Sequence, residues 1–269
     1  MLLTIDIGNT NITLGVFDGE RLVRHWRIGT KKARTADEYG LMLMSLLSHS
    51  SIAPSELDAA VMSSVVPPVQ ETALAALRDY LGIRPLVVEP GVKTGMPIMT
   101  DNPREVGADR IVNAVAAYDR FKGPVIVVDF GTAVTLDYIT ARGEYAGGAI
   151  APGVSVSAEA LFHRTSKLPR IELKRPRSVI GKNTLESLRS GLFYGFLSLV
   201  DGMVERMRSE AAAETGTGRM NVIATGGFAA LFAGGSRTID ETDEFLTLKG
   251  LRIIHDTNRP ERKRAGAGL

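Results

Sequence analysis

The chain has 269 residues, 44% hydrophobic and 23% charged, so it is long enough for one large or two medium domains with a buried core. A formal net charge of +2 is too small to indicate a nucleic-acid-binding surface, and the absence of cysteine excludes disulfides, thiolate zinc sites and a cysteine nucleophile. The first residues form a strand pattern, not a signal peptide, and no apolar run reaches about 18 residues. We therefore expect a soluble, cytoplasmic protein that binds neither membrane nor nucleic acid.

Hydrophobic periodicity in the first half of the chain predicts a mixture of strands and helices. Residues 2–29 carry alternating apolar runs, and the Asp18-Gly19 pair within them is a strong hairpin signal, so we expect three antiparallel strands. Pro103 would occupy the first turn of a helix that extends to Tyr118, where proline is tolerated. The elements expected between these segments are a helix over residues 35–48, a strand over 58–66, a helix over 71–81, a strand over 85–90 and a loop over 91–103.

The second half begins by repeating the opening of the chain. Residues 4–20 read TIDIGNTNITLGVFDGE, and residues 127–144 read VVDFGTAVTLDYITARGE. Both run from an apolar strand into an aspartate, a glycine turn and two further strands, although the hydroxyl residue follows the glycine one position sooner in the second copy. The repeat indicates a duplicated domain, so we divide the chain into domains 1–118 and 119–269.

The remainder of the second half predicts mostly helix. A short helix follows Pro152, a long helical pattern covers about residues 183–213, and a strand then runs into the Gly226-Gly227 turn. A short helix over residues 228–232 follows this turn. The basic residues from about 259 onward read as a solvated, flexible tail.

The turn from Asp6 to Thr10 has two interpretations. A glycine turn presents backbone N–H groups without an intervening Cβ, and Asn9 and Thr10 add donors, which suits a phosphate. Asp6 beside a phosphate would require a cation, and Mg²⁺ held directly or through water would satisfy it. The alternative is a plain Asx-type hairpin turn.

The second copy of this turn, from Asp129 to Thr132, favours phosphate binding, because two such turns could hold a polyphosphate from both sides. Asp129 would again need a cation beside it. A further turn, Ala224–Gly227, lies between a strand and a helix, where glycines let backbone approach a flat ring or a ribose. An ordinary strand-to-helix turn explains these residues equally well.

Asp109 and Arg110 stand next to each other in the otherwise apolar helix predicted after Pro103. Successive helical positions diverge by about 100°, so both side chains cannot point into one core. A glycine at position 107 would make helix formation less favourable by roughly 1 kcal/mol than an alanine would. A residue that costs stability in this way suggests that a ligand approaches the backbone closely there. Asp109 could accept a proton from a hydroxyl, and Arg110 could hold a carboxylate through two hydrogen bonds. The alternative is an exposed ion pair beside a packing glycine.

The sequence supports neither a histidine metal site nor a P-loop or Rossmann nucleotide site. The four histidines show no ligand spacing, and neither a G-x-x-x-x-G-K-[ST] loop nor a G-x-G-x-x-G segment occurs.

Motifs along nearly the whole chain resemble those of the type III pantothenate kinase family. They are DIGNTNITLGVF, NPREVGADRIVNAVAAY, VVDFGTAVTLD, GGAIAPGV, TSKLPRIEL, IGKNTLESLRSGLFYG, ATGG and LTLKGLRII. The Asp-x-Gly-x-Thr turn is shared more widely, with the acetate and sugar kinase, Hsp70 and actin superfamily. The resemblance implies an α/β protein of two duplicated RNase H-like domains, with the active site in the cleft between them.

The resemblance also implies ATP-dependent phosphorylation of the primary hydroxyl of pantothenate to 4'-phosphopantothenate, the first step of coenzyme A biosynthesis. The implied ATP-binding residues are Asp6, Ile7, Gly8, Asn9, Thr10, Asn11, Ile12, Thr13 and Thr132. The implied pantothenate-binding residues are Thr100, Gly107, Ala108, Asp109, Arg110 and Thr184, with Asp109 as the catalytic base. Asp129 would bind a monovalent cation, K⁺ or NH₄⁺, and Asp6 would lie near Mg²⁺. Family members are homodimers that complete the pantothenate site at their interface, so the long helix from Asn183 is a candidate dimer element.

One position departs from the family pattern, and other functions remain open. Thr100 stands where the family usually has a tyrosine, and threonine supplies neither the ring face nor the reach, so we expect a reshaped pantothenate site. Alternatives are a kinase of the same superfamily with another small-molecule acceptor, or a regulatory relative with altered motifs. Retention of Asp6, Asp109, Asp129 and Thr132 favours an active kinase.

Overall fold

The computed structural model describes residues 1–215 and 219–259 of the chain. The chain divides into two compact units, one formed by Met1–Gly95 with the residues from Leu248 onward and the other by Met96–Thr247. Each unit contains one five-stranded sheet of mixed parallel and antiparallel pairing. In the part of the chain that the structure describes, no helix is both long and apolar enough to cross a membrane.

The sheet of the first unit has the strand order β3-β2-β1-β4-β5. Its strands are β1 (Leu2–Ile7), β2 (Asn11–Asp18), β3 (Arg21–Gly29), β4 (Ala59–Ser64) and β5 (Leu86–Val87). β1 is antiparallel to β2 and parallel to β4, which confirms the predicted three-strand meander and the short strand after the first helix.

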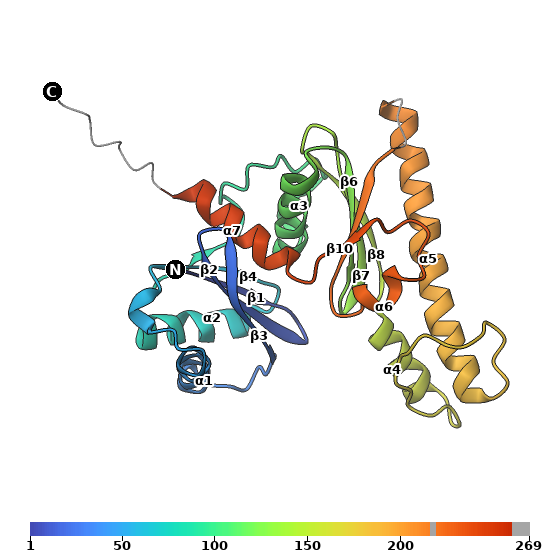
Figure 1. The fold of residues 1–269 in the computed structure, drawn as a ribbon, viewed down its shortest axis with the longest axis horizontal. Coiled ribbons are helices and arrows are strands. Elements are labelled where there is room, and N and C mark those ends of the chain that lie inside the picture. Colours follow the sequence, from blue (N-terminus) through green and yellow to red (C-terminus); the bar gives the residue numbers. More distant parts are fainter. Residues whose placement is uncertain (216–218, 260–269) are drawn as a thin grey trace. The chain divides into compact units, whose positions relative to one another are not determined.

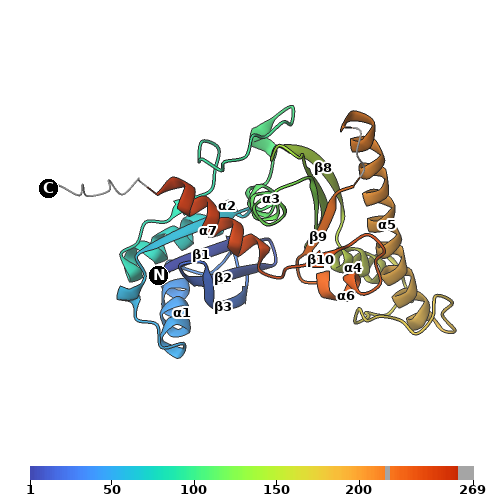
Figure 2. The same ribbon diagram turned by 45° about the horizontal axis from the view of Figure 1, so that its top comes forward.

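Helices cover both faces of this first sheet (Figures 1 and 2). The apolar side chains of one face pack with α1 (Ala36–His49) and α2 (Pro67–Ala76), which a π-helical turn, η2 (Leu77–Leu81), extends. The other face meets α7 (Leu246–Asn258), whose Leu248 lies against Gly15 of β2. α1 begins with a capping box, in which Thr35 accepts from the N–H of Glu38 and Glu38 accepts from the N–H of Thr35.

The sheet of the second unit has the strand order β10-β9-β6-β7-β8. Its strands are β6 (Val125–Phe130), β7 (Ala133–Ile139), β8 (Tyr145–Pro152), β9 (Asn221–Thr225) and β10 (Glu241–Thr242). β6 is antiparallel to β7 and parallel to β9, as β1 is to β2 and β4. The two sheets therefore share one topology, which confirms the duplication predicted from the repeat.

The helices of the second unit are α3 (Ala108–Phe121), α4 (Val154–Arg164), α5 (Thr184–Thr215) and α6 (Ala229–Ala233). α5 packs its apolar side chains on β6 and β7, where Phe193, Phe130 and Phe232 stack, and α3 covers the opposite face (Figure 1). The predicted division at residue 118 does not coincide with the compact units. The repeat marks where the second meander begins, but it does not reveal that α3 packs on β6 and β7 or that α7 belongs mostly to the first unit.

The predicted helix from Pro103 to Tyr118 needs one correction. Pro103–Glu105 forms a separate 3₁₀ turn, η3, and α3 begins only at Ala108. Gly107 is therefore the N-cap of α3, so the expected cost of a glycine inside a helix does not arise. The helix predicted over residues 71–81 begins earlier, at Pro67, and α7 was not predicted, whereas the other predicted helices lie within a few residues of their expected positions. The tail beyond Arg259 falls outside the described residues.

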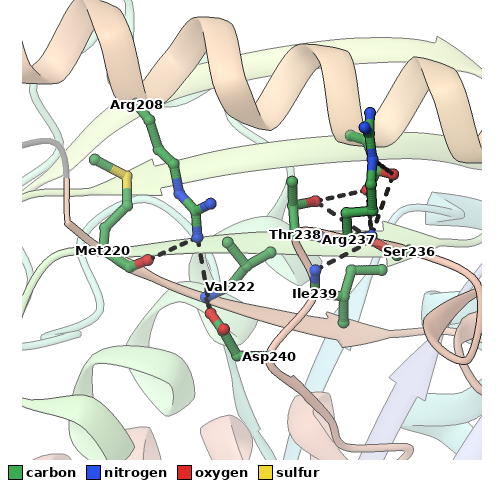
Figure 3. A network of polar contacts seen from close by, with 9 residues as sticks. Arg208, Met220, Val222, Ser236, Arg237, Thr238, Ile239 and Asp240 are labelled. Carbon is green, nitrogen blue, oxygen red and sulfur yellow. Dashed lines mark hydrogen bonds and ion pairs between the residues drawn. The ribbon is translucent and has the colours of Figure 1, made fainter.

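Polar contacts fasten the segment before β10 to α5 and β9 (Figure 3). The buried Asp201 of α5 accepts hydrogen bonds from the hydroxyls of Ser236 (2.5 Å) and Thr238 (2.8 Å) and from the N–H of Arg237 (3.2 Å). Burial opposes ionisation of Asp201, but these donors outweigh it and lower its pKa. Two turns later on α5, Arg208 donates to the carbonyl of Met220 at 3.0 Å.

We expect Asp201→Ala to lower the free energy of unfolding by about 3 kcal/mol, because it leaves buried donors without an acceptor. Urea denaturation would measure this. Arg237→Ala is the matched control, since its side chain, 79% exposed, meets the same carboxylate only in a 3.6 Å ion pair. The lowered pKa of Asp201 implies that its contribution is present above pH about 4 and declines as the pH falls through that pKa. Equal losses in the two variants would contradict this account.

Candidate active site

The first predicted phosphate turn connects β1 to β2. The N–H of Gly8 donates to the carbonyl of Asn11 at 2.9 Å, and the hydroxyl of Thr30 donates to the carbonyl of Gly8 at 2.7 Å. Asn9, Thr10 and Asn11 are exposed on this closed hairpin. The turn is thus a hairpin that also presents polar groups outward. This geometry is compatible with both interpretations from sequence, and phosphate binding stays a prediction.

Two of the predicted ATP-binding residues in this segment have buried side chains. Ile7 and Ile12 pair across the hairpin and belong to the hydrophobic core of the first unit. Only their backbone groups remain for a ligand. Thr13 is half-buried on β2, directly opposite Asp6.

Each central strand places an aspartate beside a buried hydroxyl residue of its parallel neighbour. Asp6 of β1 lies in register with Ser63 of β4, whose hydroxyl donates to its Oδ1 at 2.8 Å. Asp129 of β6 lies in register with Thr225 of β9 in the same way. Both hydroxyl residues are buried, while both carboxylates are half-exposed. The duplicated sheets therefore hold one oriented carboxylate each, close to the end of the central strand.

Asp129 is further fixed by α3 and by the turn after β9. Asn113 donates to its Oδ2 at 3.2 Å and accepts at 2.7 Å from the hydroxyl of Thr247. A Cβ on Gly226, whose φ is +90°, would lie 2.4 Å from Oδ1 of Asp129. Gly226 therefore makes room for the carboxylate of Asp129 and the backbone of Phe130, and the approach of a ligand to this turn stays a prediction.

The second predicted phosphate turn is shorter than the first by one residue. Here the N–H of Gly131 donates to the carbonyl of Ala133 at 3.0 Å, so the bond spans two residues instead of three. This explains why the hydroxyl residue follows the glycine one position sooner, as Thr132 does, and it leaves Thr132 exposed.

Asp6 and Asp129 could each supply one ligand to a cation whose remaining ligands are water or substrate phosphates. Within the described residues, no group of three or more His, Cys, Asp or Glu side chains could enclose a metal ion. Mg²⁺ commonly takes one or two carboxylates and fills its remaining positions with water and substrate phosphates. A single oriented carboxylate beside an exposed glycine turn is compatible with that mode of binding.

Asp109 lies in the first turn of α3 and is mostly shielded from solvent. Its Oδ1 accepts from the N–H of Arg110 at 2.8 Å. Burial raises the pKa of Asp109, the Arg110 N–H opposes the shift, and the nearby negative charge of Asp137 raises the pKa further. A carboxylate with a raised pKa is a stronger base than an ordinary aspartate, which suits proton acceptance.

Arg110 is held by an aspartate that the sequence analysis did not single out. Its Nε and Nη2 lie 2.9 and 2.6 Å from Oδ1 of Asp137 on β7. The hydroxyl of Tyr145 donates to the same oxygen at 2.5 Å, and Thr135 donates to Oδ2 at 3.2 Å. Arg110 therefore has an intramolecular partner and is not an exposed ion pair with Asp109. A signal existed in the sequence, because a charged residue interrupts the apolar pattern of a predicted strand.

Thr100 lies near this cluster, whereas Thr184 does not join it within the chain. The segment before Thr100 pairs with the start of β8, where the N–H of Met99 donates to the carbonyl of Tyr145 at 2.8 Å. The hydroxyl of Thr100 is buried and has no hydrogen-bond partner among the described residues. Thr184 is exposed at the start of α5, and no hydrogen bond in the described chain connects it to Asp109 or Arg110.

Comparison with known proteins connects this geometry to one family. The sequence model for type III pantothenate kinase matches residues 2–206. A type III pantothenate kinase of Pelobacter propionicus is 56% identical over 259 residues, which is 96% of this chain and 100% of the relative. Those of Geobacter sulfurreducens and Myxococcus xanthus are each 54% identical, over 96% of this chain and 100% and 99% of theirs.

Solved structures with much lower sequence identity share the fold. A putative Baf family transcriptional activator from Campylobacter jejuni superposes with a TM-score of 0.59 at 19% identity, over 95% of this chain and 98% of its own. A putative 2-dehydro-3-deoxygalactonokinase from Sinorhizobium meliloti also gives 0.59, at 13% identity and 97% coverage of both chains. At such identities the likeness concerns the fold alone.

Proposed function

The chain belongs to the type III pantothenate kinase family, and we propose that it transfers the γ-phosphoryl group of ATP to the primary hydroxyl of pantothenate, the first step of coenzyme A biosynthesis. The observation that carries this proposal is that the start of α3 places two groups side by side in the sequence, Asp109, a shielded carboxylate of raised pKa, and Arg110, which carries a guanidinium. Together they offer a proton acceptor and a carboxylate-binding group, and pantothenate carries both a hydroxyl and a carboxylate.

Phosphoryl transfer depends mainly on positioning and on neutralising charge. Thr10 and Asn11 of the first turn and Thr132 of the second would donate hydrogen bonds to the phosphates of ATP, together with the backbone N–H groups exposed there. Asp6 would hold Mg²⁺ directly or through water, and Asp129 would hold K⁺ or NH₄⁺. Bound there, these cations would neutralise charge on the phosphates.

The acceptor would bind beside α3. Arg110 would donate to the carboxylate of pantothenate, Asp109 would accept the proton of its primary hydroxyl late in the transfer, and Gly107 and Ala108 would contact it through their backbone. Gly107 admits no side chain at this point, because a Cβ there would lie 2.6 Å from Oδ1 of Asp109.

We expect Asp109→Asn to fold, to bind ATP, and to lose about 10²- to 10⁴-fold in kcat, because general base catalysis commonly contributes that much. A coupled assay of ADP release, run with and without pantothenate and in K⁺ and then Na⁺, would measure it. The wild-type protein should release ADP only with pantothenate, and faster in K⁺. Release independent of pantothenate, or a variant with wild-type turnover, would contradict the proposal, and a panel of sugar acceptors would test the alternative substrate.

Thr100→Tyr should lower the KM for pantothenate about two- to tenfold, because an aromatic ring adds contact area beside the acceptor. Met99→Tyr is the matched control, since Met99 is the preceding residue and its side chain is exposed. The same initial-rate assay measures both variants. An unchanged or raised KM in Thr100→Tyr would contradict the placement of Thr100 in the acceptor site.

We also propose that the protein is a homodimer in which Thr184 of one chain completes the acceptor site of the other. Large apolar side chains are exposed in the segment beside Thr184, at Val179, Ile180 and Leu185, and exposed apolar surface commonly marks an interface. This segment belongs to the second unit, as Asp109 does.

Light scattering should therefore report twice the 28.9 kDa of one chain for the wild-type protein. Ile180→Glu should shift the mass towards that of one chain, because it places a charge in the apolar contact. Leu41→Glu is the control, since Leu41 is also an exposed apolar residue, 62% exposed against 73% for Ile180, but lies on α1 of the first unit. A wild-type protein that is monomeric at micromolar concentration would contradict the dimer.

A further inference from the structure

Asp137 is a buried carboxylate to which the proposed reaction assigns no role. Its side chain is 1% exposed, yet it lies in the middle of β7 and faces α3. Burial raises its pKa, while the Arg110 guanidinium and the hydroxyls of Tyr145 and Thr135 lower it. In the described part of the chain, Asp137 accepts from four donor atoms, Nε and Nη2 of Arg110 and the hydroxyls of Tyr145 and Thr135.

Among the residues that the structure describes, hydrogen bonds engage only one edge of the Arg110 guanidinium. A guanidinium has five N–H donors in a planar fork, and Asp137 takes the Nε donor and one of the Nη2 donors. The donors of Nη1 and the second hydrogen of Nη2 point away from this contact. The ring of Tyr145 lies 5.9 Å from the guanidinium carbon and restrains it from one face. Arg110 is thus clamped along one edge and keeps a second edge for a planar anion.

The duplication indicates that this sheet topology does not require an ion pair at the position of Asp137. Asp129 faces Thr135 across the hairpin as Asp6 faces Thr13, so Asp137 occupies the position that Gly15 has in the first unit. The first sheet therefore forms without an ion pair at this point. Burying a charged pair costs desolvation energy that an apolar pair would not, so a buried ion pair is weak evidence for stability.

Arg110 directly follows Asp109, so anchoring one side chain also constrains the other. Asp109 accepts from the N–H of Arg110, and both belong to the first turn of α3. A shift of the guanidinium by about 1 Å would misplace the carboxylate of the bound pantothenate, and a positional error of this size can lower the rate about 10²-fold.

We propose that Asp137, together with Tyr145, is a positioning group that fixes the guanidinium of Arg110 by one edge, so that its other edge receives the carboxylate of the acceptor. This inference rests on the proposed function and extends it to two residues outside the motif that contains Arg110. The charge of Asp137 lies on the far edge of the guanidinium, so it does not face the bound anion.

Steady-state kinetics of Asp137→Asn and Tyr145→Phe test the inference. Asp137→Asn should raise the KM for pantothenate at least tenfold and leave the KM for ATP within about twofold, with a smaller fall in kcat. Tyr145→Phe removes one donor but keeps the ring, so it should raise the same KM by less. Asp119→Asn is the control, because it removes an exposed ion pair with Lys122 on the same helix without touching Arg110.

The pH profile supplies a readout that simple loss of stability would not change. The charged and titratable groups facing Asp109 are Arg110, Asp137 and Tyr145. Asp137 raises the pKa of Asp109, and activity falls when Asp109 is protonated. The acidic limb of kcat/KM should therefore move to lower pH in Asp137→Asn and stay in place in Asp119→Asn.

The outcomes separate this inference from the proposed function. Wild-type protein that shows no pantothenate-dependent release of ADP would overturn both. Active wild type with an unchanged pantothenate KM in folded Asp137→Asn, or with equal rises in the two KM values, would overturn the inference alone. If Asp137→Asn does not fold, Tyr145→Phe decides: a selective rise in the pantothenate KM supports the inference, and a wild-type KM overturns it.

Discussion

The central strand of each sheet pairs antiparallel on one side and parallel on the other, and the arrangement of the candidate site depends on this. In β1 and β6 the antiparallel partner returns through a glycine turn, so the polar turn lies at the carboxyl end of the strand. The parallel partner brings Ser63 or Thr225 into register with the aspartate that precedes this end. Open α/β sheets commonly bind ligands beyond the carboxyl ends of their strands. One pairing pattern, used twice, thus generates two oriented carboxylates and two exposed turns.

The duplicated sheets have diverged in what their second strands carry. In the first unit, Gly15 lets α7 approach closely, and Leu248 packs where a side chain would otherwise stand. In the second unit, the same position holds Asp137, and the facing helix, α3, contributes Arg110. The first sheet therefore meets α7 through an apolar contact at this position, and the second sheet meets α3 through a charged one. The charged face is the one next to Asp109, which agrees with a division of labour in which the second unit binds the acceptor.

The fold could be predicted largely from the sequence because its signals are local. Asp18-Gly19 marks a hairpin, the spacing of apolar residues over 35–48 marks α1, and alternating apolar residues mark the strands. The predicted start of α3 is too early because Pro103 begins a separate 3₁₀ turn, and Gly107, interpreted from sequence as lying inside the helix, is its N-cap. The contact between Arg110 and Asp137 joins residues 27 positions apart. It depends on which helix covers which sheet face, and periodicity does not encode that.

The two glycine turns differ in length by one residue, and this difference lies in the turn and not in a strand. Side chains alternate between the faces of a strand, so one extra residue within β2 or β7 would turn Leu14 or Leu136 out of its core. Placed in the turn, the change leaves Thr13 and Thr135 in matching register. It alters only the loop that connects the strands. The turns are therefore where the two copies of an ancestral domain could acquire different ligand contacts while both hydrophobic cores stayed intact.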